Sequence, residues 1–256
     1  MWTVPGAPAL LPDARQGTTV WGTDLPTTEH MDRFKQPEGR YGDCPTRQHD
    51  SPRASSMSPS EEERRFRFEE IIRSDSELMA LLIRLRDLCL PQGRLVAGCL
   101  YQTVWNALTG RPRGTGIQDY DLIYFDDDLS WNAEDAVIRR VTDATSDCVG
   151  PVQVRNQARV HLWFENRFGA PYPPLHCADE ALERYASVVH AVGVRLEADG
   201  RFDVVAPFGL NDLFAMVIRP NPVLDNIASH SRKAARAQAI WPEITVIPWN
   251  AEGSHV

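Results

Sequence analysis

Apolar residues recur at helical spacing in the first regular part of the chain, between residues 66 and 90. The positions are Phe68, Ile71, Ile72, Leu78, Leu81, Leu82, Leu85 and Leu88. Ser74-Asp75 divides this stretch into two expected helices, and Pro91-Gln92-Gly93 ends it. A short strand is expected over residues 94–97, followed by Gly98 and a helix from Cys99 to about Thr109.

The strongest strand pattern covers residues 119–125, where aromatic and β-branched residues dominate. Two runs, 191–196 and 202–206, are joined by a turn containing Gly200 and predict a β-hairpin. The same patterns predict strands over 152–154, 159–164 and 244–247, and helices over 131–145, 178–187, 211–218 and 225–239. Helices and strands alternate at first and mix later, so we expect an α+β fold with a mixed β-sheet flanked by helices.

Residues 1–58 have a different composition from the rest of the chain. They are rich in Pro, Gly, Thr, Ser and Asp and show no sustained helical or strand period. Such a segment buries too little apolar area to offset the entropy of ordering. We therefore expect a disordered or low-complexity extension over 1–58, one domain over 59–250 and a short tail over 251–256.

Composition and charge narrow the class of protein. The net charge is −8, which disfavours a long nucleic acid as partner, because such binding depends on neutralising many phosphates. Five cysteines without a Cys-x-x-Cys pair favour a reducing compartment over a disulfide framework. Neither a signal peptide nor an apolar run of roughly 20 residues is present, so we expect a cytoplasmic protein without a membrane span.

Asp119 and Asp121 are the candidate metal ligands. They stand two positions apart on the strand expected over 119–125, so both side chains leave the same face. Their apolar neighbours predict partial burial, and a buried carboxylate requires a cation partner or a metal ion. Mg²⁺ and Mn²⁺ prefer such oxygen ligands. The alternative is a solvated pair on a surface strand. Asp126 and Asp128 share the spacing but follow the strand, where capping or solvation explains them.

The order of strand, glycine, helix, loop and Asp-Tyr-Asp strand resembles the nucleotidyltransferase superfamily, which has the polymerase-beta-like fold. Several longer strings resemble one branch, a bacterial predicted-nucleotidyltransferase family of unknown substrate. The strings are Thr103-Val104-Trp105-Asn106, Gly116-Ile117-Gln118-Asp119-Tyr120-Asp121-Leu122-Ile123-Tyr124-Phe125-Asp126, Asn156-Gln157-Ala158-Arg159-Val160-His161-Leu162-Trp163, Ala206-Pro207-Phe208-Gly209-Leu210-Asn211-Asp212-Leu213-Phe214 and Ile218-Arg219-Pro220-Asn221-Pro222. The resemblance covers about residues 62–249.

The resemblance implies a nucleotide site. A helix opened by Gly98 and Cys99 is expected to hold the triphosphate of an NTP, because its first N–H groups lack intrahelical partners. Asp119 and Asp121 are the implied catalytic, metal-binding residues, with Mg²⁺ or Mn²⁺ as cofactor. Cys99 departs from the family pattern, in which a Ser or a second Gly follows the glycine.

Further residues extend this expected site. Arg159 and His161 are expected to share a strand face and to contact the nucleotide, the alternative being that Arg159 pairs with an acid. The superfamily often has a third carboxylate on a neighbouring strand, and the candidates are Glu165 and Asp203, expected within about 6 Å of the pair.

Two other groups of charged residues are expected to have ordinary roles. Arg232, Lys233 and Arg236 are predicted to form a solvated basic face on the last helix. Arg219 is expected to pair with a carboxylate such as Asp212.

The sequence thus predicts transfer of a nucleoside monophosphate from an NTP to an unidentified hydroxyl acceptor. The acceptor could be a small molecule, a protein side chain or an RNA end. The alternative is a catalytically weakened nucleotide- or protein-binding module on the same fold. A toxin-like transferase paired with an antitoxin is a third hypothesis, which the sequence does not address.

Overall fold

The structure is a computed structural model that describes residues 59–148 and 150–249. The extension expected over 1–58 and the tail expected over 251–256 lie outside the described residues. Two helices come first, α1 (Pro59–Ser74) and α2 (Ser76–Asp87). Asp75 separates them as expected, because its side chain accepts hydrogen bonds from the N–H groups of Glu77 and Leu78, both at 3.1 Å.

A five-stranded mixed sheet forms the centre of the fold, in the order β3-β2-β1-β4-β5. The strands are β1 (Arg94–Val96), β2 (Tyr120–Tyr124), β3 (Val152–Asn156), β4 (Gly193–Leu196) and β5 (Phe202–Val205). Only β2 and β3 pair in parallel within this sheet, and α4 (Trp131–Ala144) connects them as a crossover helix. The α+β architecture and the β4–β5 hairpin are therefore confirmed.

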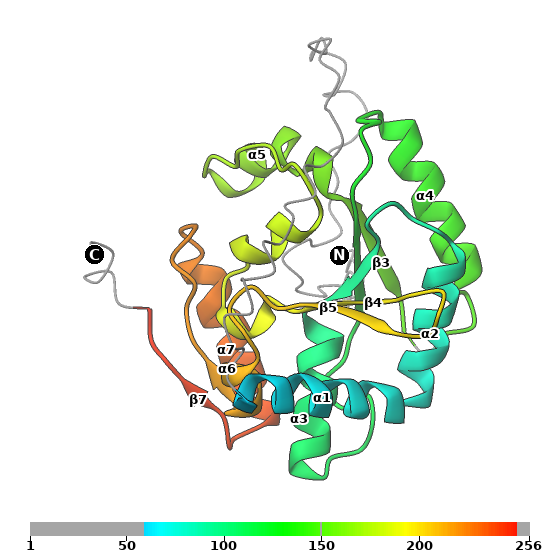
Figure 1. Cartoon of the computed structure of the whole chain (residues 1–256). Helices are drawn as coiled ribbons and strands as arrows, with labels where there is room; N and C mark the ends of the chain where they lie inside the picture. Colours follow the sequence, from blue (N-terminus) through cyan, green and yellow to red (C-terminus); the bar gives the residue numbers. More distant parts are fainter. Residues whose placement is uncertain (1–58, 149, 250–256) are drawn as a thin grey trace, which may run out of the picture. The chain divides into compact units, whose positions relative to one another are not determined.

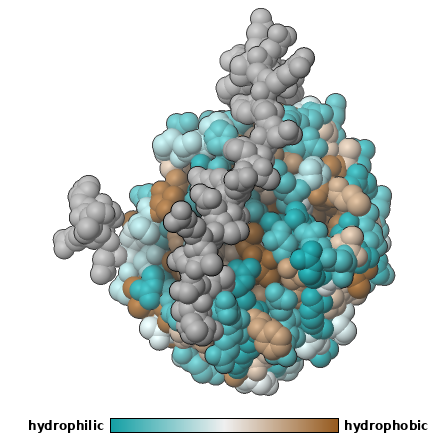
Figure 2. Space-filling view, viewed as in Figure 1, coloured by the Kyte–Doolittle hydropathy of each residue, from teal (hydrophilic) through white to brown (hydrophobic). Residues whose placement is uncertain are grey.

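Helices cover the sheet on its sides (Figure 1). α4 packs against β3, and α2 contacts β4. α3 (Gly98–Thr109) lies between the sheet and α1 and is buried over its first nine residues except the half-exposed Gly98. Among the helices within residues 59–249, none has both the length and the apolarity to cross a membrane. The face in Figure 2 is mainly hydrophilic, with hydrophobic residues in separate patches.

The strand predicted over 159–164 is wrong. The chain instead forms a 3-10 helix, η2 (Gln157–Leu162), followed by the short helix α5 (Phe164–Phe168). The turn begins at Asn156, whose side-chain oxygen accepts a hydrogen bond from the N–H of Ala158 at 3.1 Å. This local bond competes with continued strand pairing, as asparagine side chains commonly do.

The C-terminal part also differs in detail from the expectation. The helix predicted over 211–218 ends early as α6 (Asn211–Phe214), because Met216 has a φ of 54° and the chain then forms β6 (Val217–Ile218). β6 pairs in parallel with β7 (Thr245–Val246), and α7 (Ile227–Ile240) lies between them in sequence. Over 178–187 the chain forms the 3-10 helix η3 (Asp179–Arg184). A further 3-10 turn, η4 (Val188–His190), precedes β4.

Candidate active site

The two candidate carboxylates lie at the start of β2. Asp119 immediately precedes the strand, and Asp121 is its second residue; both are half-buried. Because side chains alternate along a strand, the two carboxylates leave the same face, while Tyr120 between them is buried on the other. Asp121 lies opposite Val96 of β1 and opposite Gln153 of β3. The pair is therefore held by strands on both sides.

The N-terminus of α3 converges on this pair. β1 ends at Val96, and the chain turns into α3 at Ala97, which has a φ of 56° and a ψ of −113°. This conformation is rare for a residue with a side chain and costs about 1–3 kcal/mol. It is held by hydrogen bonds from the Ala97 N–H to the Val192 carbonyl, at 2.9 Å, and from the Leu100 N–H to the Ala97 carbonyl, at 3.0 Å. The turn therefore fixes the direction of the first helical N–H groups.

Cys99 lies close to both carboxylates. Burial raises the pKa of its thiol well above the ordinary value, and the charges of Asp121 and Asp119 raise this pKa further. The thiol is therefore protonated and packs as a small buried side chain. The structure thus brings together four of the predicted residues, Gly98, Cys99, Asp119 and Asp121.

Gly98 leaves free space at the start of α3. A Cβ added to Gly98 would meet only the Nε2 atom of Gln102 at 3.7 Å, an ordinary contact. Folding alone therefore does not require glycine here. A phosphate group that approaches the helix N-terminus would need this space, because such anions bind the unpaired backbone N–H groups directly.

Among residues 59–148 and 150–249, no basic side chain lies within 4.0 Å of either carboxylate. The Oδ1 atom of Asp121 is buried without a hydrogen-bond partner in the described part of the chain. Burial and the charge of Asp119 raise the pKa of Asp121 to about 7. Asp119 also has a raised pKa because of burial, and its Oδ2 atom accepts a hydrogen bond from Gln153 Nε2 at 2.8 Å. Two adjacent oxygen ligands, one of them unsatisfied, fit a hard divalent cation.

Two basic side chains of α7 face the pair. The positive charges of Arg236 and Lys233 lower the pKa of Asp119 and so offset part of the increase caused by burial. Burial lowers the pKa of Lys233 to about 8, although Asp121 and Asp119 act to raise it. No carboxylate oxygen of the described residues lies within 4.0 Å of the Lys233 ammonium group. Arg236 donates a hydrogen bond to the Gly116 carbonyl at 2.9 Å. The solvated basic face predicted for this helix is therefore wrong for Lys233 and Arg236, while Arg232 is exposed.

The comparison with known families decides the class of this protein. A family model described as Nucleotidyltransferase matches residues 84–246, a range that contains all of these site residues. The chain belongs to this nucleotidyltransferase family. No curated protein matches the chain.

A solved structure supports the fold of this nucleotidyltransferase. It was determined by NMR and is described as revealing a CCA-adding enzyme head domain. The two chains are 23% identical with a TM-score of 0.58, and the match covers 71% of this chain and 95% of that chain. At this identity the likeness establishes the shared fold.

The string Thr103-Val104-Trp105-Asn106 positions the site in this nucleotidyltransferase. Trp105 Nε1 donates to the Leu213 carbonyl at 2.9 Å, which joins α3 to α6. Asn106 Nδ2 donates to the Thr115 carbonyl at 3.0 Å, and its Oδ1 accepts from Trp241 Nε1 at 3.2 Å. These bonds connect α3 and the end of α7 to the loop that leads into Asp119.

The structure places Arg159 and His161 on η2, away from the expected strand face. Arg159 is buried and paired with Glu134 of α4, and its Nε donates to the Leu129 carbonyl at 3.0 Å. The paired alternative for Arg159 is therefore what the structure contains. Burial lowers the pKa of His161, whose ring is neutral at neutral pH. Neither residue joins the group around Asp119 and Asp121.

Neither candidate for the third carboxylate, Asp203 or Glu165, lies beside Asp119 and Asp121. Asp203 lies on β5, three strands from β2, which is roughly 14 Å at normal strand spacing. Its carboxylate is held by Arg94 and Arg195, both at 2.8 Å. Glu165 is exposed on α5, and the described residues contain no group of three or more Asp, Glu, His or Cys suited to a metal. On the neighbouring strand the residue beside Asp121 is Gln153 instead.

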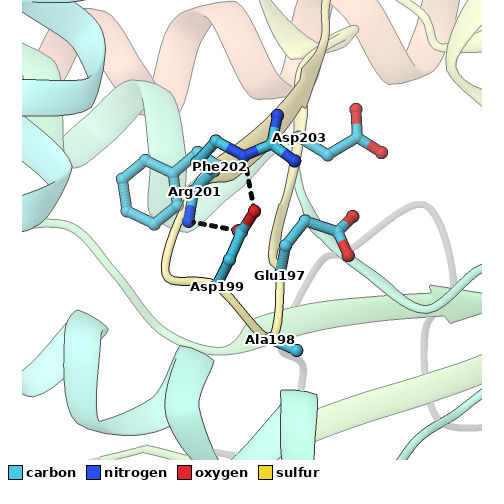
Figure 3. A pocket seen from close by; sticks show the side chains of 6 residues that line it. All are labelled: Glu197, Ala198, Asp199, Arg201, Phe202 and Asp203. Atoms are coloured by element: carbon cyan, nitrogen blue, oxygen red, sulfur yellow. Dashed lines mark hydrogen bonds and ion pairs between the residues drawn. The ribbon is translucent and has the colours of Figure 1, made fainter.

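A hollow of about 450 Å³ lies elsewhere, at the turn between β4 and β5 (Figure 3). Six residues line it: Glu197, Ala198, Asp199, Arg201, Phe202 and Asp203. Two of its carboxylates form ion pairs, Asp199 with Arg201 of the lining at 2.6 Å and Glu197 with the neighbouring Arg195 at 2.7 Å. This hollow is formed within one hairpin and is not part of the candidate site.

The pairing of Arg219 with Asp212 is confirmed, with 2.9 Å between Nε and Oδ2. Lys233 is the site residue that the sequence analysis missed. The available signal was its position on the expected last helix beside two small residues, Ala234 and Ala237, which are buried. Lys233 and Arg236 are three apart and therefore lie on one side of that helix.

Proposed function

We propose that this nucleotidyltransferase moves a nucleoside monophosphate from an NTP to a hydroxyl acceptor, with Mg²⁺ or Mn²⁺ held by Asp119 and Asp121. The supporting observation is the buried Oδ1 atom of Asp121, which has no hydrogen-bond partner in the part of the chain that the structure describes. It lies beside Asp119, at the N-terminus of a helix that opens with Gly98. A divalent ion bound there would neutralise phosphate charge and lower the pKa of the attacking hydroxyl.

The residues of the chain bind and orient the triphosphate. The first N–H groups of α3 attract phosphate oxygens, and the absence of a side chain at Gly98 lets them approach the backbone. Lys233 adds a positive charge that no carboxylate contacts directly within the described residues. Phosphate oxygens bound there would compensate the cost of its partial burial.

The proposed reaction is a displacement at the α-phosphorus of the NTP. The acceptor oxygen forms a bond to the α-phosphorus, the bond to the β-phosphate oxygen breaks, and pyrophosphate leaves with both electrons of that bond. The hydroxyl proton is released to solvent or to a nearby carboxylate. The residues Gly98 and Lys233 stabilise the negative charge that accumulates on the departing pyrophosphate.

The test is a calorimetric titration of the protein with each NTP, in the presence of Mn²⁺ and, separately, of Mg²⁺. Wild type should bind metal and nucleotide together, and Asp121→Asn should reduce this binding at least about 100-fold, because a charged ligand is lost. Gly98→Ala should fold normally yet bind NTP about tenfold more weakly, with Mn²⁺ affinity unchanged. A wild-type protein that binds no NTP with either ion would refute the proposal.

A matched control is available in the same chain. Glu197 and Asp199 are also two residues apart in the sequence, like Asp119 and Asp121, but Asp199 lies in an exposed turn. Asp199→Asn removes the same charge and should leave metal and nucleotide binding unchanged. An equal loss in this variant would mean that net charge, rather than the site at β2, controls binding.

A second candidate function, nucleotide binding without catalysis, is favoured by one observation. The superfamily often has a third carboxylate on a neighbouring strand, whereas the residue beside Asp121 on β3 is Gln153. The two functions differ in pyrophosphate release. Incubation with an NTP labelled at the α-phosphate should give Asp121-dependent transfer of label if the protein is an enzyme, and tight binding without transfer if it is a binding module.

A further inference from the structure

Arg155 of β3 is a third basic residue near the carboxylate pair, after Lys233 and Arg236. In the parallel register of β2 and β3, Asp121 lies opposite Gln153 and Ile123 lies opposite Arg155. Arg155 therefore leaves the same face of the sheet as Asp119 and Asp121. It is offset from Asp121 by two residues along the strand, roughly 7 Å, which an extended arginine side chain can span.

The Arg155 guanidinium is held near the pair without contacting it. The side chain is half-buried, and its NH1 group donates to the neighbouring Val154 carbonyl at 2.7 Å. Within the described residues no carboxylate oxygen lies within 4.0 Å of the guanidinium. Burial lowers the pKa of Arg155, and the charge of Asp121 partly offsets this change. Donors therefore remain on a guanidinium close to the reaction centre.

The buried arginines of the same sheet and its crossover region show the usual arrangement. Arg94 on β1 contacts Asp179 at 2.5 Å and Asp203 at 2.8 Å, and Arg159 contacts Glu134. These ion pairs compensate the cost of removing each guanidinium from water. Arg155 is partly removed from water on the same scaffold but has no such carboxylate among residues 59–148 and 150–249, so its guanidinium can accept an anionic ligand.

Arg155 and Lys233 approach the carboxylates from different sides. Lys233 lies on the side of β1 and β4, since His230, three residues earlier on α7, hydrogen-bonds to Ser187 at 2.8 Å, directly before η4 and β4. Gly98, at the end of β1, is on that side as well. Arg155 lies on β3, the edge strand beyond β2. The site therefore has the cations of α7 on the side of the helix N-terminus and Arg155 on the opposite side of the carboxylates.

We infer that Arg155 binds a phosphate group of the acceptor, so that the acceptor is a phosphorylated molecule with a free hydroxyl group. This inference rests on the proposed function. In a displacement at phosphorus, the attacking oxygen enters opposite the leaving pyrophosphate. With the triphosphate at Gly98 and Lys233, the acceptor enters on the β3 side. A guanidinium there can hold two phosphate oxygens at once and so orient the acceptor.

The competing explanation is that Arg155 only neutralises Asp121. The two explanations differ in which ligand Arg155 affects. A neutralising residue would change the affinity for Mn²⁺ and for the metal–nucleotide complex. A residue that binds the acceptor phosphate would leave both unchanged and would alter only a second anion site, present while the nucleotide is bound.

The experiment uses the full chain saturated with Mn²⁺ and a non-hydrolysable NTP analogue. Inorganic phosphate is then titrated at constant ionic strength, with KCl as the balancing salt, and binding is measured by calorimetry. Wild type should bind one phosphate. Arg155→Met should weaken this binding about tenfold or more, as expected for loss of a charge-assisted contact, with analogue affinity within about twofold. Arg155→Lys should give an intermediate affinity, because it retains charge but loses the bidentate geometry.

Two matched variants separate the possible failures. Arg139→Met removes an exposed arginine of α4 and should change neither affinity, while Lys233→Met should weaken the analogue and spare the phosphate. Unchanged phosphate binding in Arg155→Met, or no phosphate binding by the analogue-saturated wild type, would overturn the inference alone. Weaker analogue binding in Arg155→Met would place Arg155 in the nucleotide site and also overturn it. Failure of wild type to bind the analogue would contradict the proposed function itself.

Discussion

β3 carries a polar region at each end, and the two regions differ in whether their side chains find partners. At the C-terminal end, Asn156 Oδ1 accepts from the Asp126 N–H at 3.0 Å, its Nδ2 donates to the Asp126 carbonyl at 2.8 Å, and Arg159 pairs with Glu134. At the N-terminal end, Gln153 contacts Asp119, but Asp121 keeps a buried oxygen without a partner in the described residues.

The difference distinguishes buried polar residues that stabilise the fold from buried polar residues that are available to a ligand. A buried ion pair with its hydrogen bonds satisfied fixes the positions of elements and needs no ligand. A buried oxygen without a partner costs free energy that only a ligand would recover. Both regions contain residues of the strings that resemble the family, since Asp121 lies in one and Asn156 in another, so this resemblance alone does not distinguish them. Four substitutions test this comparison, and their expected effects on stability decrease from Arg159→Met to Ala97→Gly.

Arg159→Met should have the largest effect, on stability. It leaves Glu134 buried without its cation, and breaking one partner of such a pair typically costs about 3–5 kcal/mol. Urea unfolding followed by tryptophan fluorescence measures the loss. The double variant with Glu134→Leu should recover part of it, because no lone charge remains. If Arg159→Met were as stable as wild type but bound no nucleotide, this region would belong to the active site.

Asn106→Leu should cost about 2 kcal/mol, because it leaves the Thr115 carbonyl and the Trp241 indole N–H without partners. It tests the connection between α3 and the loop that carries Asp119. Hydrogen exchange over residues 111–119 should accelerate relative to the rest of the domain. Uniform acceleration across the sheet would show that Asn106 supports the whole fold and not this loop in particular.

Asp121→Asn should stabilise the metal-free protein by about 1 kcal/mol at pH 8, since a partly buried charge without a partner is removed. In the folded wild type the pKa of Asp121 is raised to about 7. The unfolded value is about 4. Between these values the folded state binds more protons than the unfolded state, so this group's contribution to stability falls as pH rises from about 4 to 7.

The measurement is the difference in thermal stability between wild type and Asp121→Asn across that pH window, without added metal. The difference should grow in favour of the variant up to about pH 7 and then level off. With Mn²⁺ added, wild type should become the more stable of the two proteins, because only wild type has a carboxylate at position 121. A difference that stays constant with pH would contradict the raised pKa of Asp121.

Ala97→Gly should have the smallest effect, a gain of less than about 1 kcal/mol. Glycine adopts the positive φ of this position without strain, but its greater freedom in the unfolded chain offsets part of the gain. Thermal unfolding measures it, with Ala97→Val as the opposite control, since a β-branched residue should be clearly destabilising there. A loss of stability in the glycine variant would mean that the backbone at Ala97 is not strained.

The sequence predicted those features that depend on neighbouring residues. The strand at 119–125 and the hairpin over 191–206 were recognised from local patterns, and the apolar context of Asp119 and Asp121 singled them out. The strand over 159–164 was wrong because one side-chain bond, from the Ala158 N–H to Asn156, redirects the chain.

Residues whose role depends on distant partners could not be predicted in this way. Asp203 was a candidate metal ligand, but its carboxylate accepts a hydrogen bond from Arg94, which lies 109 positions earlier in the chain. Lys233 appeared to be an ordinary charged residue of an amphipathic helix. Its role depends on how α7 packs beside α3 and the loop before β2, a contact fixed by Trp241 and Arg236.

The position of α7 in the chain has a consequence for how the protein is made. A ribosome releases Gly98, Asp119 and Asp121 more than 100 residues before Lys233. Throughout that interval the nascent polypeptide has the two carboxylates without Lys233 and Arg236, the cations of α7 that face them. The group of cations beside the helix N-terminus is therefore complete only after α7 has been made, and a chain that stops before Ile227 lacks these cations.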